Sequence, residues 1–330
     1  MADREGEGRR RARPSFALGP VKVRAGSRKE VALPISRLVT GAEVSLPVHV
    51  LHGRQDGPTV WVSAAIHGDE VVGIEVVRRV MGLLDPKQIR GTLIAVPIVN
   101  VIGVMTGDRY LPDRRDLNRS FPGSARGPLA GRIAHLLMTE VVSRCDVGID
   151  LHTAADRRSN LPQIRCDLED TQTRALAEAF AAPVLNHARL RDGSLRWAAR
   201  EAGARVLLYE AGEAWRFDEW AVQPGVDGVL RVLAALEMIP AEQAPAAPEQ
   251  PSALCWTSGW VRARRDGLLH MDVSLGQTVA VGERLGALYD SFGRRQATVK
   301  ADRAGIVIGR TEAPLVHRGD ALVHIGQTAD

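Results

Sequence analysis

Two short polar motifs each follow an apolar run and carry residue types that bind metal ions. His-Gly-Asp-Glu occupies residues 67–70, directly after the apolar run 59–66, and Asp-Leu-His-Thr occupies residues 150–153, after the run 145–149. Both runs are typical of buried strands, and an open α/β sheet binds its ligands where its strands end. Two histidines and one glutamate form a common ligand set for catalytic zinc, whose fourth position is left for water. The sequence therefore predicts the metal site of a hydrolase, formed by His67, Glu70 and His152.

The spacing within the two motifs supports one shared site. If a helix begins after the first strand, His67 and Glu70 lie three residues apart on one helix face. Gly68 between them would permit a close approach of another backbone segment. Asp69 and Asp150 are candidates to hold a histidine ring from its far side. The alternative for the first motif, taken alone, is a capped helix start with a surface histidine.

The segment at residues 108–123 concentrates arginines near the predicted metal site. It reads Asp-Arg-Tyr-Leu-Pro-Asp-Arg-Arg-Asp-Leu-Asn-Arg-Ser-Phe-Pro-Gly. A guanidinium group stays charged at every working pH and binds a carboxylate through two parallel hydrogen bonds. The segment therefore favours an anionic group on the substrate, whereas the alternative is a solvated loop with surface ion pairs.

A glutamate follows the strand predicted at residues 205–209. Glu210 in this position is well placed to act as a general base toward a metal-activated water. Glu213 is close in sequence, and the spacing leaves both residues open. The alternative for either is a structural or helix-capping acid.

Apolar periodicity predicts strands and helices that alternate through the first 240 residues. Edge strands are expected within residues 16–53 and a long ordered loop at residues 103–128. Further strands are expected at 59–66, 91–99, 145–151 and 205–209, and helices at 70–84, 130–142, 171–180, 193–202 and 226–237, with Asp192 as the cap of the helix at 193–202. This alternation predicts an α/β fold with a largely parallel sheet.

The composition changes abruptly at residues 240–251, which read Pro-Ala-Glu-Gln-Ala-Pro-Ala-Ala-Pro-Glu-Gln-Pro. Such a segment is typical of an extended, semi-stiff linker. A weak repeat follows, in which residues 267–288 and 305–325 each contain short apolar runs joined by glycine turns. We therefore expect a disordered basic tail at residues 1–15, a catalytic domain at 16–240, a linker at 241–253 and a small all-β barrel-sandwich domain at 254–330.

The bulk composition is that of a globular protein. The 330 residues are 45% hydrophobic and 25% charged, with a formal net charge of +4, and this balance is ordinary for soluble domains. No apolar run approaches the ~20 residues of a membrane-spanning helix. The arginines of the tail lack the aromatic residues and motifs of nucleic-acid binding. The three cysteines lack the spacing of a disulfide framework or a sulfur metal site, so we expect a cytoplasmic location.

In combination, the motifs resemble those of the succinylglutamate desuccinylase/aspartoacylase family, a deacylase branch of the zinc carboxypeptidase fold. Four motifs carry the resemblance in this order: His-Gly-Asp-Glu at 67–70, Asp-Leu-Asn-Arg-Ser-Phe-Pro-Gly at 116–123, Asp-Leu-His-Thr at 150–153 and Glu-Ala-Gly-Glu at 210–213. The resemblance covers roughly residues 40–240. It implies a zinc-carboxypeptidase-like mixed sheet, largely parallel and flanked by helices, and the segment beyond the linker looks like that family's β-domain.

The resemblance also implies roles for the metal ligands and the general base. His67, Glu70 and His152 would hold one Zn²⁺ per chain. Glu210 would be the general base and then the general acid.

For the substrate-facing residues, the resemblance implies a division of labour. Arg109 would match the arginine that polarises the scissile carbonyl, with Arg114 or Arg115 as substitutes. Asn118 and Arg119 would bind the α-carboxylate of the substrate.

The C-terminal repeat is also similar to biotinyl and lipoyl carrier domains. Such carriers present a modifiable lysine in the hairpin between their two halves. That position falls near Arg294 and Arg295, and Lys300 falls within a predicted strand, so we expect a structural or gating domain. Tyr289, the tyrosine beyond the linker, has no motif that matches the family's substrate-contacting tyrosine.

The sequence favours a zinc-dependent deacylase that hydrolyses the amide bond of an N-acyl amino acid or a related small amide. The first alternative is a metallocarboxypeptidase acting on peptides, because it shares the catalytic residues. The second is a non-catalytic zinc- or ligand-binding protein. The expected partner is the small amide substrate, with no nucleic acid and no membrane, and a homo-oligomer is compatible with the sequence. The acyl group and the amine product stay open.

Overall fold

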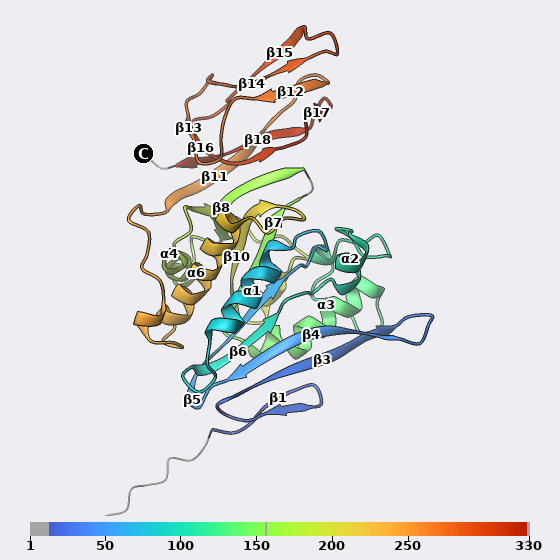
Figure 1. Ribbon diagram of the computed structural model, residues 1–330, viewed down its shortest axis with the longest axis vertical. Helices are drawn as coiled ribbons and strands as arrows, with labels where there is room; N and C mark the ends of the chain where they lie inside the picture. Colours follow the sequence, from blue (N-terminus) through green and yellow to red (C-terminus); the bar gives the residue numbers. More distant parts are fainter. Residues whose placement is uncertain (1–12, 156, 329–330) are drawn as a thin grey trace, which may run out of the picture.

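The computed structural model describes residues 13–155 and 157–328. Within these residues a twelve-stranded sheet passes through the molecule from end to end (Figure 1). In spatial order its strands are β3 (Ser27–Arg37), β4 (Glu43–His52), β6 (Arg90–Val96), β5 (Gln55–Ala64), β7 (Val147–Ala154), β10 (Arg205–Glu213), β8 (Arg158–Cys166), β9 (Val184–His187), β11 (Ala253–Arg262), β18 (Ala321–Thr328), β16 (Gly305–Thr311) and β13 (Thr278–Val279). With its helices, it forms a mixed α/β fold.

Four neighbouring strands at the centre of this sheet, β6, β5, β7 and β10, run parallel to one another. Their residues are mostly buried, as expected for parallel strands covered on both faces. The flanking strands β4 and β8 are antiparallel to this group. Because the central strands are parallel, their carboxyl ends meet at one edge, and the register places Glu210 of β10 opposite His152 of β7.

Helices cover both faces of the central strands. On one face α1 (Val72–Leu83), α4 (Thr171–Phe180) and α6 (Glu219–Ala235) contribute to a single apolar core. On the other face α3 (Leu129–Glu140) and α5 (Leu195–Glu201) share a second core with the hairpin of β1 (Phe16–Leu18) and β2 (Val21–Val23). The sheet is thus a rigid middle layer, which fixes the positions of side chains at its carboxyl edge.

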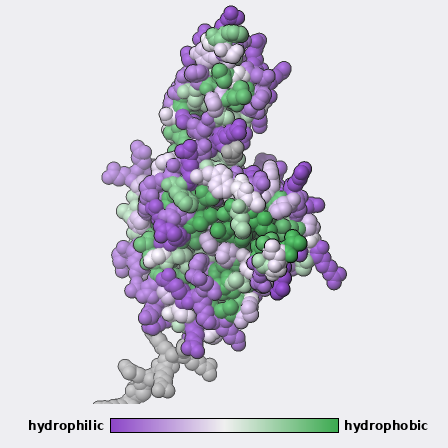
Figure 2. Space-filling model, turned by 45° about the vertical axis from the view of Figure 1, so that its right-hand side comes forward, coloured by the Kyte–Doolittle hydropathy of each residue, from purple (hydrophilic) through white to green (hydrophobic). Residues whose placement is uncertain are grey.

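Beyond residue 252 the chain forms an all-β unit, here called the β-domain (residues 253–328). Its second sheet has the order β15 (Arg295–Lys300), β14 (Arg284–Tyr289), β12 (Gly267–Met271) and β17 (Leu315–Val316). This sheet shares an apolar core with β11, β13, β16 and β18. Strand β11 pairs with β9, and β16 pairs with β8, so one sheet continues into the β-domain. Figure 2 shows the β-domain projecting as the narrower part of the molecule.

Two predicted boundaries were wrong for local reasons. The predicted loop at 103–128 contains most of a helix, α2 (Val101–Thr106), whose first turn is capped by the Asn100 side chain accepting from Gly103 N at 2.8 Å. It also contains a 3₁₀ turn, Leu117–Arg119. At α5 the capping residue is Ser194, which accepts a hydrogen bond from Trp197 N, and not Asp192.

Helix α6 begins at Glu219, seven residues before the predicted start. Pro224 and two glycines weaken the helical signal of this segment. Tertiary contacts compensate: the hydroxyl of buried Tyr209 donates to the Ala221 carbonyl at 2.7 Å. Strand β8 was not predicted, although its residues Asn160 and Arg165 contact Glu210.

The chain end also differs from the prediction. Arg13, expected within a solvated tail, donates to the Gly91 carbonyl at 2.6 Å and pairs with Asp56 at 3.0 Å. The tail residues 1–12 lie outside the described residues.

The three cysteines are buried free thiols. Within the described chain, every helix is too short or too polar to cross a membrane.

Candidate metal centre and active site

The side chains of His67, Glu70 and His152 converge at the carboxyl ends of β5 and β7. One ligand atom from each residue lies within 4.8 Å of the other two, and all three residues are buried. His67 and Glu70 precede α1, which begins at Val72. The two residues therefore do not share the helix face that the spacing predicted. A tight turn brings them together instead, and Glu70 N closes it by donating to the His67 carbonyl. The group is able to bind a metal ion.

The Glu70 carboxylate contacts both imidazole rings. Its two oxygens lie 2.8 Å from His67 Nδ1 and 2.7 Å from His152 Nδ1. The backbone N–H of Thr153 also donates to this carboxylate, at 3.3 Å. The two Nδ1 atoms thus face a common point beside a carboxylate, as a metal ion requires of its ligands.

Two further carboxylates hold the far sides of the rings. His152 Nε2 lies 2.8 Å from Asp150 Oδ2, and His67 Nε2 lies 3.2 Å from Asp116 Oδ1. Metal-binding histidines usually present their second nitrogen to such a carboxylate, which fixes the ring orientation and the tautomer. The sequence offered Asp150 and Asp69 for this task. Asp116 stands where Asp69 was expected, and Asp69 Oδ1 has no hydrogen-bond partner among the described residues.

The electrostatics of the cluster oppose the usual effect of burial. Burial disfavours charge on His152, but Asp150 and Glu70 outweigh it and raise its pKa well above the ordinary value. His67 shows the same direction, with burial opposing and Glu70 and Asp116 raising its pKa. Burial likewise opposes charge on Glu70, and the two histidines hold its pKa well below normal. The carboxylates of the cluster therefore stabilise positive charge between them, either on the histidine rings or on a bound cation.

Arg109 contacts this cluster directly. Its Nη1 lies 2.7 Å from Glu70 Oε1, and its Nη2 lies 3.1 Å from His67 Nε2. Gly68 makes this packing possible, because a Cβ there would lie 2.1 Å from the Gly103 carbonyl carbon and 2.3 Å from the Asp108 oxygen. The substitutes that the sequence left open, Arg114 and Arg115, are exposed and do not line the cavity described below.

Asn118 and Arg119 lie on the 3₁₀ turn beside the cluster. The Asn118 side chain is buried, and its Oδ1 accepts from the backbone N–H of Leu195 at 2.9 Å. Asn118 also lines the cavity. Arg119 is exposed and donates to the Asn118 carbonyl. The turn itself is fixed by Asp116, whose side chain accepts from Asn118 N at 2.8 Å.

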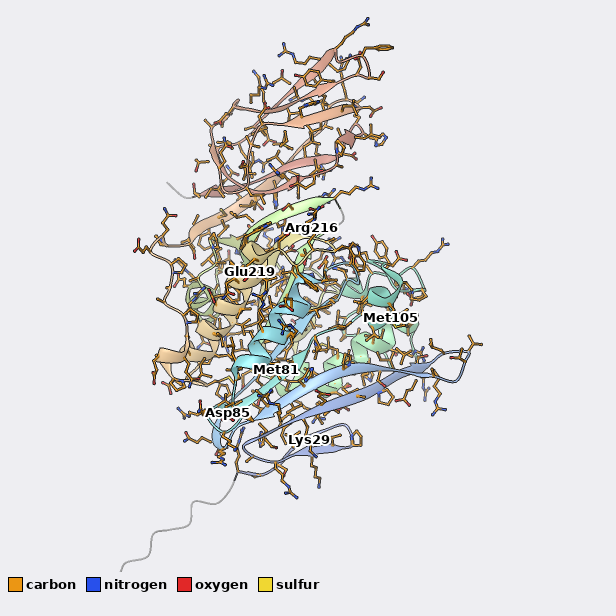
Figure 3. The ribbon with its side chains drawn as sticks, in the orientation of Figure 1. Lys29, Met81, Asp85, Met105, Arg216 and Glu219 are labelled. Carbon is orange, nitrogen blue, oxygen red and sulfur yellow. The ribbon has the colours of Figure 1, made fainter. Side chains whose placement is uncertain are left out.

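Glu210 lines the same cavity from β10. Its Oε2 accepts a hydrogen bond from Asn160 Nδ2 at 2.8 Å, and its Oε1 lies 3.4 Å from Arg165 Nη1. Both partners belong to β8, so the unpredicted strand orients this carboxylate. Glu213, the competitor left open by the sequence, instead pairs with Arg216 at 3.0 Å and is absent from the cavity wall. Figure 3 labels Arg216 in the segment that follows β10.

These residues enclose a cavity of about 370 Å³. Its wall contains the three residues of the metal-ligand group together with Arg109, Asn118, Arg119 and Glu210. It also contains Thr153 of the second motif and residues that the sequence did not single out: Arg158, Asn160, Arg165, Arg189, Arg191, Ser194, Arg196 and Trp260. Most belong to β8 or to the segment from β9 to α5. A run of polar residues alternating with apolar ones at 158–166 is the signal that could have identified β8.

The β-domain contributes Trp260 to this wall. The indole stacks on the imidazole of His324, with ring centroids 4.7 Å apart and planes 10° from parallel. The guanidinium carbon of Arg158 lies 5.2 Å from the indole centroid. The β-domain is thereby part of the cavity and not only an appendage.

Comparison with known proteins agrees with this architecture. Residues 56–236 match the family model described as succinylglutamate desuccinylase/aspartoacylase catalytic domain, which is more than half of the chain. The chain belongs to the succinylglutamate desuccinylase/aspartoacylase family. The predicted resemblance to that family is therefore confirmed. Relatives named as a deacetylase and a desuccinylase hydrolyse amides, as their names indicate.

Named relatives extend the similarity beyond the catalytic domain. The chain is 28% identical over 314 residues to an N-alpha-acetyl-L-2,4-diaminobutyric acid deacetylase of Halomonas elongata, with 90% of each chain covered. It is also 28% identical over 182 residues to a succinylglutamate desuccinylase of Burkholderia orbicola, covering 49% of this chain and 52% of the relative. A succinylglutamate desuccinylase/aspartoacylase structure from Rhodobacter sphaeroides superposes with a TM-score of 0.83 at 28% identity, covering 93% and 97% of the two chains.

Proposed function

We propose that this chain is a zinc-dependent deacylase that hydrolyses the amide bond of an N-acyl amino acid or a related small amide. One observation carries the proposal: a three-residue metal-ligand group, an arginine and a separate carboxylate meet in one cavity. The names of the two relatives, a deacetylase and a desuccinylase, support amide cleavage. The expected partner is the small amide itself.

Zn²⁺ fits the ligand group. His67, Glu70 and His152 would hold one ion per chain, since imidazole nitrogen and carboxylate oxygen are donors that zinc prefers, and three protein ligands leave a position for water. When bound, zinc supplies a Lewis acid that polarises a carbonyl and lowers the pKa of water to about 7. Asp150 and Asp116 would keep the two rings oriented toward the ion.

Glu210 would move the proton. It would accept a proton from the attacking water and deliver it to the amide nitrogen as the carbon–nitrogen bond breaks, which yields a carboxylate and an amine. Its hydrogen bond from Asn160 and its contact with Arg165 hold the carboxylate in one orientation. General acid–base transfer of this kind contributes roughly 10²–10⁴ to the rate.

Arg109, Asn118 and Arg119 would act on the substrate. Arg109, beside the ligand group, would donate to the carbonyl oxygen as negative charge develops on it. Donors aimed at such an oxygen typically contribute several kcal/mol to transition-state stabilisation. Asn118 and Arg119 would hold the α-carboxylate of the substrate and so align its amide with Glu210.

A metallocarboxypeptidase acting on peptides is the main alternative. Trp260 of the β-domain lines the cavity. Because the β-domain thereby limits the space beside the cavity, this favours a small substrate over a peptide chain. Comparing an acetyl- or succinyl-amino acid with a tripeptide on the purified protein separates the two functions, and faster tripeptide hydrolysis would replace our proposal with the alternative. A non-catalytic binding protein would cleave neither.

The direct experiment is a hydrolysis screen of an N-acyl amino acid panel with the zinc-supplemented protein. We expect turnover that a chelator removes and added zinc restores. Glu210→Gln is the companion variant, and unchanged turnover would remove Glu210 from the mechanism. We further propose that residues 16–240 form the catalytic domain and that a separate all-β domain spans residues 254–330 after the linker 241–253. The cytoplasmic location stays a prediction.

A further inference from the structure

The strand that holds the Glu210 carboxylate is itself held by the β-domain. Strand β8 pairs along one edge with β10, which carries Glu210. Along its other edge it pairs with β16 of the β-domain at residues 158–160 and with β9 at residues 163–166. The part of β8 that carries Asn160 therefore lies between the strand of the candidate base and a strand of the β-domain.

A β-bulge fits β16 to this part of β8. Between Val307 and Gly309 the pairing of β16 with β18 shifts by one residue, so Ile308 is the extra residue of the bulge. The Ile308 carbonyl accepts a hydrogen bond from Gln163 Nε2 at 3.0 Å, and Gln163 is fully buried on β8. Bulges bend a strand and are common next to active sites. Here the bulge fixes the position of Gly309 against β8.

Gly309 lies directly against Asn160. The two residues are partners in the register of β16 and β8, and both are buried. A Cβ on Gly309 would lie 2.7 Å from Asn160 Oδ1, whereas the next nearest atoms, on His324 and Trp260, would lie at 3.4 and 3.5 Å. Only the first of these distances is much shorter than an ordinary van der Waals contact. The missing side chain of Gly309 therefore leaves room for the Asn160 amide.

The Asn160 amide transmits this packing to Glu210. Its Oδ1 faces Gly309, and its Nδ2 donates to Glu210 Oε2 at 2.8 Å. Because both atoms belong to one amide group, a shift of Oδ1 also displaces Nδ2. The hydrogen bond to Glu210 then weakens, since its strength depends on distance and angle.

We infer that Gly309 of the β-domain is a positioning residue for the general base and acts through Asn160. This inference rests on the proposed deacylase function and deepens it, because it gives the β-domain a part in the proton-transfer step. A domain that only limits access to the cavity acts on substrate binding and so on KM. A domain that orients the base acts on kcat, because a catalytic group must be held close to its productive geometry.

Gly309→Ala in the zinc-loaded full-length chain tests the inference. The added methyl group displaces the end of one side chain, so the fold should tolerate it. With the N-acyl amino acid that the protein cleaves best, we expect kcat to fall roughly fivefold and KM to change less than about twofold, because a misplaced catalytic group lowers rate more than binding. Unchanged kcat, or a rise in KM alone, would overturn the inference.

Gly267→Ala is the matched control within the β-domain. Gly267 begins β12 in the second sheet, and a Cβ there would lie 2.9 Å from the Tyr289 carbonyl oxygen and 3.3 Å from the Leu288 Cβ. This variant strains the β-domain at a site outside the cavity wall. Its kcat and KM should match those of the original chain, and a fall in kcat as large as that of Gly309→Ala would contradict the inference.

A double-mutant cycle tests whether Gly309 acts through Asn160. Asn160→Ala removes the atom that the new methyl group meets, so adding Gly309→Ala to it should lower kcat by less than about twofold more. Equal falls in the two backgrounds would overturn the inference. If Gly309→Ala alone fails to fold, the double variant, in which the contact is relieved, is compared with Asn160→Ala, and a further large fall in kcat contradicts the inference.

A crystal structure of Gly309→Ala tests the geometry without reference to activity. We expect Asn160 Nδ2 to lie beyond hydrogen-bonding distance of Glu210 Oε2, and an unchanged 2.8 Å contact would overturn the inference. If the original chain cleaves no N-acyl amino acid, the proposed function fails instead. The distance between Asn160 and Glu210 in the variant then decides the inference alone.

Discussion

Two buried histidines, one at the edge of the central sheet and one in the β-domain, have opposite electrostatics. His152 and His324 are 3% and 6% exposed. Carboxylates raise the pKa of His152 well above its ordinary value against the effect of burial. Burial, helped by Arg165 and Arg303, lowers the pKa of His324 to about 3. His152 lines the cavity, and His324 lies against Trp260 of the same cavity wall.

The difference shows why His152 suits metal binding and His324 does not. His152 has Asp150 behind it and Glu70 in front of it, whereas His324 stacks on Trp260 and its Nδ1 has no hydrogen-bond partner among the described residues. Burial without a carboxylate partner lowers the pKa of a histidine, so the His324 ring stays neutral and packs against Trp260. Carboxylates on both sides produce a ring that is oriented and ready to hold a cation. Variants of the residues on each side test this contrast.

The largest contrast is expected between His152→Ala and His324→Phe. Loss of His152 removes a ligand, so bound zinc and activity should both disappear, with kcat/KM reduced more than about thousandfold. His324→Phe keeps an aromatic ring beside Trp260 and should change kcat/KM only a few-fold. Zinc content by elemental analysis and steady-state kinetics measure both. A zinc-containing, active His152→Ala protein would refute the assignment of this ligand.

Glu210→Gln should separate metal binding from proton transfer. We expect a loss of roughly 10²–10⁴ in kcat, because the amide has the shape of the carboxylate but cannot accept the proton. Zinc content should stay at one per chain, unlike in His152→Ala. Loss of zinc in this variant would instead make Glu210 a ligand, and the general-base role would have to be abandoned.

A smaller effect is expected from Asn160→Ala, which removes the 2.8 Å hydrogen bond to Glu210. Misorientation of the base should lower kcat about tenfold with little change in KM. Asn186→Ala is the control, since Asn186 is equally buried on neighbouring β9 but bonds to Gln163. A similar fall in kcat for both variants would mean that Asn160 acts through general stability.

The smallest effect concerns stability and pH. The pKa of His324 is about 3 in the folded chain and about 6.5 when unfolded. The unfolded state therefore binds more protons below pH 6.5, and this ring's contribution to stability is lost as the pH falls from 6.5 toward 3, by up to about 1.4 kcal/mol per pH unit. Melting temperatures measured between pH 7 and pH 5 should fall less steeply for His324→Phe than for the original chain. Parallel curves would show that folding does not lower the pKa of His324.

Much of the architecture could be predicted from the sequence because it rests on local patterns. The helix at Thr171–Phe180 matches its prediction in full, and the central strands at β5, β7 and β10 were predicted as apolar runs. The ligand group follows from this, since parallel strands bring His67 and His152 to one edge. The mixed α/β class and the family are confirmed, whereas the domain limits stay a prediction.

The rest depends on contacts that are distant in sequence. Strand β8 is antiparallel to β10 and carries Asn160 and Arg165 to Glu210, and no local pattern indicates that partnership. Asp116 reaches His67 across 49 residues, so the sequence offered the adjacent Asp69 instead. Trp260 enters the cavity only because the sheet continues from β9 into β11. These placements are decided by packing, which spacing does not encode.

A zinc titration of the chelator-stripped protein tests the central claim most directly. Hydrolysis of the best N-acyl amino acid and bound zinc would be measured on the same samples. We predict no turnover without metal, a linear rise with added zinc and a plateau at one zinc per chain, with the binding lost in His152→Ala and kept in Glu210→Gln. Full activity of the metal-free protein would contradict the account.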